Sequence, residues 1–153
     1  MQSVTYGDVT LQQMFTIIKD YISREHNQQY NIIVGTDSQN YDLTKTVIVV
    51  AVCRVGKGGI FFYDIKNAKR ITSIRQKLFY ETSLSLHLAL QLTELLEKEK
   101  MPYKIGIHVD AGYKGPTSQI IPEITSWVHS CGFECQVKPD SYAASCIANR
   151  FTK

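Results

Sequence analysis

The sequence contains no apolar run that approaches the length of a membrane span, and its first residues lack the basic-then-apolar pattern of a secretory signal. It also lacks internal repeats, low-complexity stretches and a recognisable linker. These absences exclude the membrane-spanning, fibrous and disordered classes of protein. We therefore expect a single globular domain over residues 1–153, with residues 1–26 as a helical extension packed on it, in the cytoplasm.

Cysteine is too sparse to suggest a disulfide framework or a zinc site. The chain has 4 cysteines, and only Cys131 and Cys135 form a closely spaced pair. A structural zinc site needs four ligands, usually from two such pairs, and no second pair is present. We interpret the cysteines as reduced, packed thiols.

The formal net charge of +3 is small, so it permits a nucleic-acid partner without requiring one. Its distribution is more informative, because the segment from residue 66 to residue 77 has basic side chains and no acidic one. The basic residues are Lys66, Lys69, Arg70, Arg75 and Lys77. Two interpretations stand: a solvated loop and helix start, or a surface that contacts a phosphate backbone.

Hydrophobic periodicity predicts helices over residues 10–24 and 71–98, from a helix cap at Thr117 or Ser118 to His129, and from Ala143 to about Phe151. Strands are expected over residues 31–37, 46–55, 60–65, 104–110 and 134–138. Three consecutive strands followed by strands that are each reached through a helix indicate an α/β fold with a mixed five-stranded sheet. Its parts are a three-strand antiparallel meander and two parallel strands, with helices on both faces. The first and fourth strands then lie side by side at the sheet centre.

Three carboxylates occupy places where folding alone would put apolar side chains. Asp37 ends the first predicted strand, Asp110 ends the fourth, and Glu81 interrupts the apolar stripe of the longest helix. Buried charges are costly unless they are paired or bound to a cation, so the three together suggest a divalent metal site. His108 falls on the same strand face as Asp110, where a hydrogen-bonded strand histidine is favoured over a catalytic one. Trp127 is interpreted as core packing.

Several segments in order resemble the YkuK-type family of bacterial proteins, which are similar to ribonuclease H. They are Val34-Gly35-Thr36-Asp37-Ser38-Gln39, Tyr80-Glu81, His108-Val109-Asp110-Ala111-Gly112, Lys138-Pro139-Asp140-Ser141-Tyr142-Ala143-Ala144-Ser145 and Ala148-Asn149-Arg150-Phe151-Thr152-Lys153. The resemblance implies an RNase H-like fold and a nuclease that holds two divalent ions, Mg²⁺ or Mn²⁺, with four acidic residues. By position the first three acids correspond to Asp37, Glu81 and Asp110.

The fourth position departs from that pattern. The last predicted helix has Asn149 where the resemblance leads us to expect an aspartate, and the nearest acid, Asp140, lies where a helix cap would be. Either side chain could complete the site. The resemblance therefore implies one of two functions: a two-metal nuclease acting on RNA or DNA, or a catalytically weakened module that binds nucleic acid or a protein partner.

Overall fold

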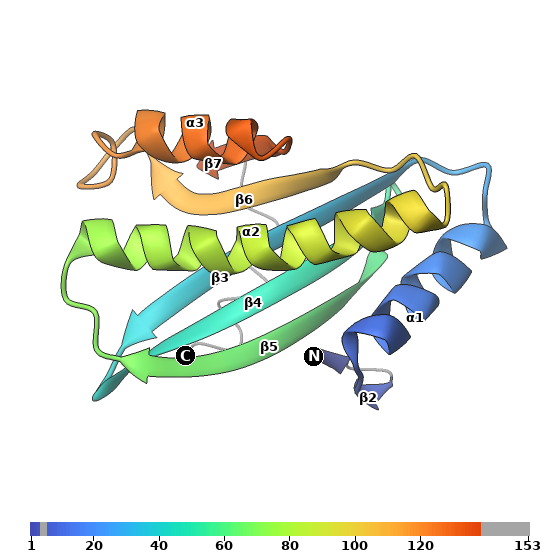
Figure 1. The fold of residues 1–153 in the computed structure, drawn as a ribbon, viewed down its shortest axis with the longest axis horizontal. Helices are drawn as coiled ribbons and strands as arrows, with labels where there is room; N and C mark the ends of the chain where they lie inside the picture. The colour runs from blue at the N-terminus through green and yellow to red at the C-terminus, as the bar shows by residue number, and fades with distance from the viewer. Residues whose placement is uncertain (4–5, 139–153) are drawn as a thin grey trace.

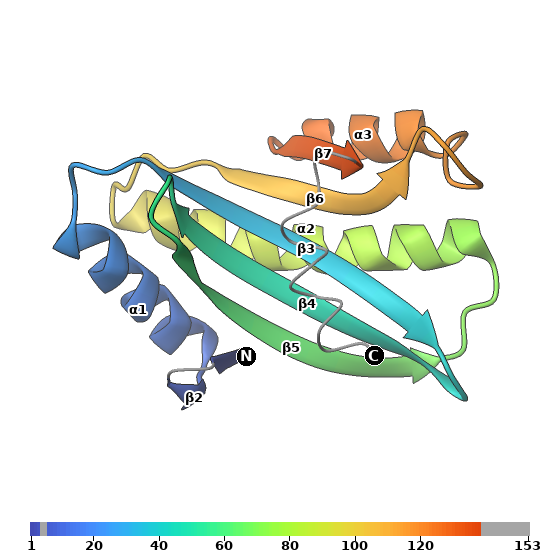
Figure 2. The same cartoon turned by 180° about the vertical axis from the view of Figure 1, so that it is seen from behind.

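The computed structural model describes residues 1–3 and 6–138, which form an α/β fold with one mixed sheet (Figures 1 and 2). The sheet has the strand order β2-β1-β5-β4-β3-β6-β7. The elements are β1 (Gln2–Ser3), β2 (Gly7–Asp8), α1 (Leu11–Arg24), β3 (Tyr30–Asn40), β4 (Leu43–Arg54), β5 (Gly59–Lys69), α2 (Ile74–Lys98), β6 (Ile105–Gly112), α3 (Ile121–Ser130) and β7 (Glu134–Lys138).

The central part of the sheet confirms the predicted topology. Strands β3, β4 and β5 form the antiparallel meander, β6 runs parallel to β3, and β7 runs parallel to β6. The predicted number of five strands is wrong, because the described residues form seven. The additional strands β1 and β2 have only two residues each and extend the sheet beyond β5, so they are too short to show an alternating sequence pattern.

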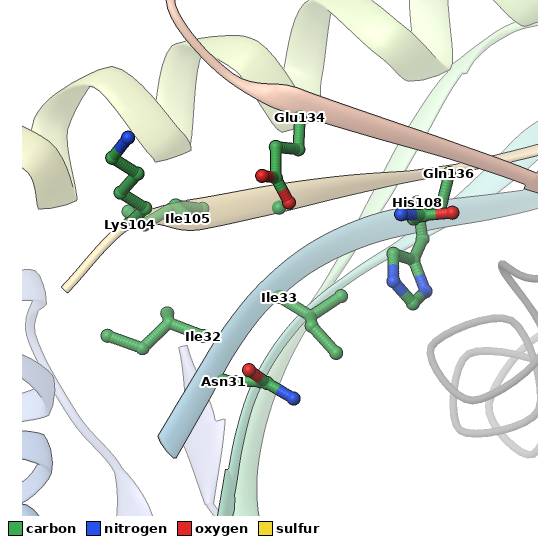
Figure 3. A pocket seen from close by; sticks show the side chains of 9 residues that line it. Asn31, Ile32, Ile33, Lys104, Ile105, His108, Glu134 and Gln136 are labelled. Atoms are coloured by element: carbon green, nitrogen blue, oxygen red, sulfur yellow. The ribbon is translucent and has the colours of Figure 1, made fainter. Parts of the chain in front are cut away.

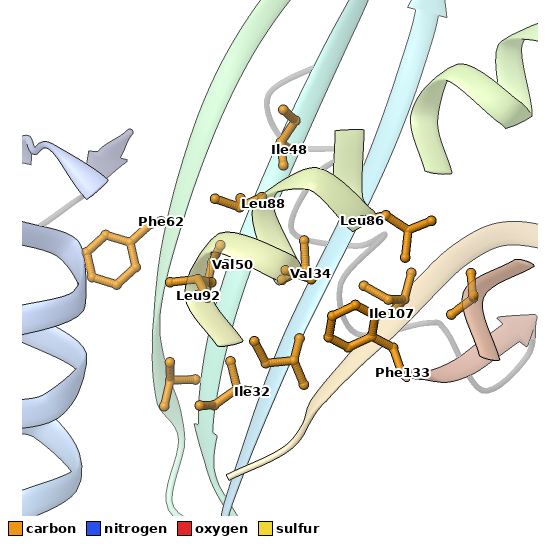
Figure 4. Close-up of a cluster of buried hydrophobic side chains, with 14 of the residues drawn as sticks. Ile32, Val34, Ile48, Val50, Phe62, Leu86, Leu88, Leu92, Ile107 and Phe133 are labelled. Atoms are coloured by element: carbon orange, nitrogen blue, oxygen red, sulfur yellow. The ribbon is translucent and has the colours of Figure 1, made fainter. Parts of the chain in front are cut away.

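Helices α1, α2 and α3 bury their apolar side chains in one cluster against a single face of the sheet (Figures 1 and 4). The alternation of β3 sends Ile32 and Val34 into this cluster, and Ile107 of β6 joins them. Figure 4 shows Leu88 and Leu92 of α2 lying over these strand residues. The helix expected from Ala143 to about Phe151, and with it the expectation of helices on both faces, falls outside the described residues.

Two helix starts test the capping arguments. Thr10 caps α1 as its spacing from Gln13 predicts, since each residue's side chain accepts a hydrogen bond from the other's backbone N–H. The predicted cap of α3 is wrong, because this helix begins at Ile121 without a side-chain cap. Thr117 is used elsewhere: its Oγ1 accepts a hydrogen bond from the N–H of Gly112 at 3.3 Å.

Strand β5 is longer than its apolar pattern indicates. The predicted strand ends at residue 65, whereas β5 continues to Lys69 in register with β4, where Thr46 faces Lys66 and Leu43 faces Lys69. Lys66 and Lys69 therefore lie on a strand and not in a loop. Cross-strand hydrogen bonds extend this strand through residues whose polar side chains give no hydrophobic signal.

Helix α2 is the longest helix, with 25 residues, and it brings Glu81 to the sheet. Its buried stripe includes Leu78, Ser85, Leu88 and Leu92, as the helical spacing predicts. Among the residues that the structure describes, no helix is long and apolar enough to cross a membrane.

Candidate metal centre

Asp37 and Asp110 lie side by side where the two central parallel strands stop pairing. The last paired residues of β3 and β6 are Gly35 and His108, and each aspartate lies two residues beyond its paired residue. Both side chains therefore point to the same face of the sheet, near the carboxyl ends of these strands. The strands do not end at the acids as predicted, because β3 continues to Asn40 and β6 to Gly112. Ligand sites of open α/β sheets lie at such ends.

Glu81 reaches this point from α2 and is anchored through β3. Thr36 Oγ1 donates a hydrogen bond to the backbone carbonyl of Glu81 at 2.9 Å, and Ser85 Oγ donates to Thr36 Oγ1 at 3.3 Å. Thr36 immediately precedes Asp37, so this polar contact fixes the helix against the strand beside the acid. All three of these polar residues, Thr36, Glu81 and Ser85, are buried.

The electrostatics show that negative charge is crowded here. Burial, followed by a side-chain hydrogen bond and charge repulsion from Asp110, raises the pKa of Asp37 to about 7. Burial, followed by repulsion from Asp37 and Asp110, raises the pKa of Glu81 to about 8. Lys77, one helical turn before Glu81, lowers both pKa values but only partly offsets these effects. Glu81 is therefore held protonated and Asp37 partly protonated near neutral pH, a state that a bound cation would reverse.

Lys138 is a member of this site that the sequence reasoning missed. Its Nζ lies 2.6 Å from Asp110 Oδ1, and this ion pair raises the pKa of Lys138. The sheet topology indicates this contact, because β7 runs parallel to β6 and its last residue therefore lies at the same end of the sheet as Asp110. A five-residue strand that ends in a lysine gives no such indication until its neighbour is known.

The donor atoms suit a hard divalent cation, because carboxylate oxygens are the ligands that Mg²⁺ and Mn²⁺ prefer. The carboxylates are not arranged as a complete set of metal ligands. Within residues 1–3 and 6–138, no three side chains of His, Cys, Asp or Glu are placed so that they could hold an ion as they stand. Asp110 is engaged by Lys138 instead. The two candidates for the fourth ligand, Asp140 and Asn149, fall outside the described residues.

The basic residues of the segment from 66 to 77 do not form one uniform surface. Arg75 makes a bidentate ion pair with Glu123 of α3, with distances of 3.1 and 2.5 Å, and its guanidinium lies 4.9 Å from the ring centroid of Phe79. Arg70 donates a hydrogen bond to the carbonyl of Tyr41 at 2.6 Å. Lys66 and Lys69, three residues apart on β5, project from opposite faces of the strand.

The structure nevertheless places this segment at the site's end of the molecule. Strands β3 and β5 run in the same direction on either side of β4. Lys69, the last residue of β5, therefore lies at the same end of the sheet as Asp37. Helix α2 starts from that end of the sheet (Figure 1), and Lys77 lies in its first turn, four residues before Glu81. Lys66, Lys69 and Lys77 are the members of the segment whose side chains make neither an ion pair nor a hydrogen bond with another described residue, whereas Arg70 and Arg75 do.

The structure also describes His108 and Trp127, the two further side chains discussed from the sequence. His108 shares the strand face of Asp110, two residues away on β6. Trp127 is partly buried against the core, and its ring stacks on Phe79 with centroids 5.6 Å apart. This stacking joins α2 to α3 and uses a face of the indole that base stacking would need.

A pocket of about 190 Å³ lies on the sheet at the amino-terminal halves of the central strands (Figure 3). It is lined by Asn31, Ile32, Ile33, Lys104, Ile105, Gly106, His108, Glu134 and Gln136. None of the three site acids lines it, so the candidate metal centre rests on the convergence of charge and not on a cavity.

Comparison with known proteins gives two findings. A family model described as "Ribonuclease H-like" matches residues 13–153. The protein "Uncharacterized protein YkuK" of Bacillus subtilis (strain 168) is 33% identical over 166 residues, covering 99% of this chain and 95% of that protein. No solved structure matches the chain significantly.

Proposed function

The chain belongs to the ribonuclease H-like family, and on that premise we propose that it is a metal-dependent nuclease that hydrolyses phosphodiester bonds of nucleic acid. The observation that carries the proposal is the side-chain contact between Asp37 and Asp110, just beyond the last paired residues of β3 and β6 and beside buried Glu81. RNase H-like folds generally use divalent metals, and this trio of oxygen donors occurs where such a fold gathers its charge.

Each acid would have a distinct part in holding Mg²⁺ or Mn²⁺. Asp37 would contact the ion from β3, and Asp110 would contact it from the neighbouring strand β6. Glu81 would approach from the helix side, held by Thr36. A bound divalent ion supplies positive charge that stabilises the developing negative charge on a phosphodiester during hydrolysis. Either Asp140 or Asn149 would complete the ligand set.

The nucleic acid would approach along the end of the sheet where Lys66, Lys69 and Lys77 lie. Lysine ammonium groups contact phosphates as point charges, so they would position a backbone without selecting a sequence. The start of α2 adds free backbone N–H groups at the same end. Arg70 and Arg75, which the sequence also assigned to this surface, contribute less in this proposal because their guanidinium groups already bind Tyr41 and Glu123.

The test combines binding with cleavage. Purified protein is titrated with Mg²⁺ and Mn²⁺ while its melting temperature is recorded, and labelled single- and double-stranded RNA, DNA and hybrid substrates are then assayed with the metal. We expect a metal-dependent rise in melting temperature and cleavage that disappears in Asp37→Asn. A melting temperature that is unchanged at millimolar metal, together with no cleavage of any substrate, contradicts the proposal.

A second function is favoured by one observation. Asp110 is bound by Lys138, and the described acids do not form a ready-made cage. An ion pair that occupies Asp110 and an incomplete set of metal ligands are features expected of a module that keeps the fold and binds nucleic acid or a protein partner without cleaving it. It predicts metal-independent binding of nucleic acid, with an affinity that Asp37→Asn leaves unchanged.

A further inference from the structure

Lys138 brings a positive charge into the acidic site from within the chain. It is the last residue of β7 and lies opposite Gly112 of β6, just beyond a register shift in the pairing of these strands. Its Nζ lies 2.6 Å from Asp110 Oδ1. The ammonium also interacts electrostatically with Asp37 and Glu81, so it lies within the field of all three carboxylates.

The backbone around Lys138 is built for this close approach. A Cβ atom at position 112 would lie 3.3 Å from the Cβ of Lys138, tighter than most real contacts, so a glycine there lets β7 and its lysine come near. The side chain of Lys138 is 56% exposed, against 24% for Asp110. Its stem is therefore anchored at the strand, while its charged end has room to move into solvent.

A divalent ion bound by Asp110 would share the carboxylate that Lys138 neutralises. The positive charges of a divalent ion and an ammonium group repel each other, so each weakens the binding of the other to this carboxylate. An ion pair with a half-exposed lysine contributes little net stability, so a divalent ion can displace it at small cost. The free energy needed to break the ion pair nevertheless lowers the net affinity of the site for the ion.

We propose that Lys138 is a tethered cation that neutralises Asp110 in the metal-free chain and competes with the divalent ion for it. Lys138 thus sets the metal affinity of the site, and the binding of Mg²⁺ or Mn²⁺ releases its ammonium group to solvent. This inference rests on the proposed function, because it assumes that Asp110 is a metal ligand.

The experiment is a Mn²⁺ titration of Lys138→Met, followed by melting temperature. Free Mn²⁺ is measured in parallel by electron paramagnetic resonance at a temperature where every variant is folded. We expect the half-saturating Mn²⁺ concentration to fall about fivefold, which corresponds to an ion pair of about 1 kcal/mol. The metal-free melting temperature should fall, since the acids lose their counter-charge, and the gain on adding metal should grow.

Two matched variants separate competition from a general charge effect. Lys138→Arg keeps the positive charge at Asp110 and should bind Mn²⁺ within twofold of the wild type. Lys104→Met removes the same charge from an exposed position at the opposite end of β6, and it should also behave as the wild type.

Several outcomes overturn the inference. An unchanged or weaker Mn²⁺ affinity in Lys138→Met does so, and so does an equal gain in Lys104→Met. If the wild type binds Mn²⁺ and Lys138→Met binds it equally, only this inference fails and the metal site stands. If neither protein binds Mn²⁺, the proposed function fails and the inference fails with it.

Discussion

At the scale of single residues, the site is defined by acids whose ionised form is disfavoured by burial and by mutual repulsion. Asp37 and Glu81 are buried at 4% and 7% exposure, and Asp37 directly faces the acid group of Asp110. Carboxyl groups with such strongly raised pKa values cluster at functional sites. The predictions at this scale concern how the repulsion is relieved.

Replacing Asp37 with asparagine should stabilise the metal-free chain and abolish its response to metal. At pH 8 one of the mutually repelling charges is removed, so the free energy of unfolding should rise by roughly 1 to 3 kcal/mol. Urea denaturation with and without Mg²⁺ measures both effects. Asp20→Asn, an exposed carboxylate on α1, serves as the control and should change stability by less than about 0.5 kcal/mol. A destabilised Asp37→Asn at pH 8 would contradict the prediction.

The stability of the metal-free chain should fall as the pH rises from about 4.5 to about 8. The pKa of Glu81 is about 8 in the folded chain against an ordinary 4.5, so between these values the folded state holds a proton that the unfolded state has released. Stability therefore decreases with pH across this window, and the loss is complete above it.

Glu81→Gln should flatten this profile, and the difference between variant and wild type should reach on the order of 3 kcal/mol at pH 9 and vanish at pH 4. Denaturation curves at five pH values give the comparison. Parallel profiles for the two proteins would show that Glu81 ionises normally in the fold.

At the scale of elements, one hydroxyl joins β3 to α2 beside the acids. Thr36→Val keeps the shape of the side chain but removes the hydrogen bond to the Glu81 carbonyl, which should lower the free energy of unfolding by about 1 kcal/mol. The same change should weaken metal binding, because Glu81 loses its support. Thr16→Val on the exposed face of α1 is the matched control. Equal effects of the two variants on metal affinity would remove Thr36 from the site.

The end of β5 should contribute more to nucleic-acid binding than the two arginines that follow it. The double variant Lys66→Ala, Lys69→Ala should reduce the slope of log affinity against log salt by about 1.5. Arg70→Ala, Arg75→Ala removes the same charge but should change the slope less, since both guanidinium groups bind within the chain. Fluorescence anisotropy at four salt concentrations distinguishes them. Equal slopes for both variants would favour a diffuse charge effect.

The elements also show what the sequence could predict. The positions of Asp37 and Asp110 followed from apolar runs that end in an acid, and Glu81 followed from a break in a helical stripe. The end of β5 and the start of α3 were not predictable in this way, because cross-strand pairing and tertiary contacts override the local pattern there. The contact of Lys138 depends on the neighbouring strand, so the sequence of β7 alone does not contain it.

At the scale of the whole molecule, metal binding should be linked to the release of protons. At pH 7 the folded chain holds protons on Glu81 and partly on Asp37, and a divalent ion binds the ionised carboxylates. Calorimetric titrations in buffers of different ionisation enthalpy should therefore report about one or more protons released at pH 7. At pH 9.5 the number should approach zero. Metal binding without proton release at pH 7 would contradict the pKa values of these acids.

The pairing of β3 with β6 has a consequence for the order of folding. The hairpins of β3, β4 and β5 join residues that are near in sequence, whereas β3 meets β6 only across the meander and the whole of α2. Closing so long a segment costs chain entropy, so we predict that the acids come together late in folding, after the main barrier has been crossed. Divalent metal and variants of Asp37 should accordingly change the rate of unfolding while leaving the rate of folding nearly constant.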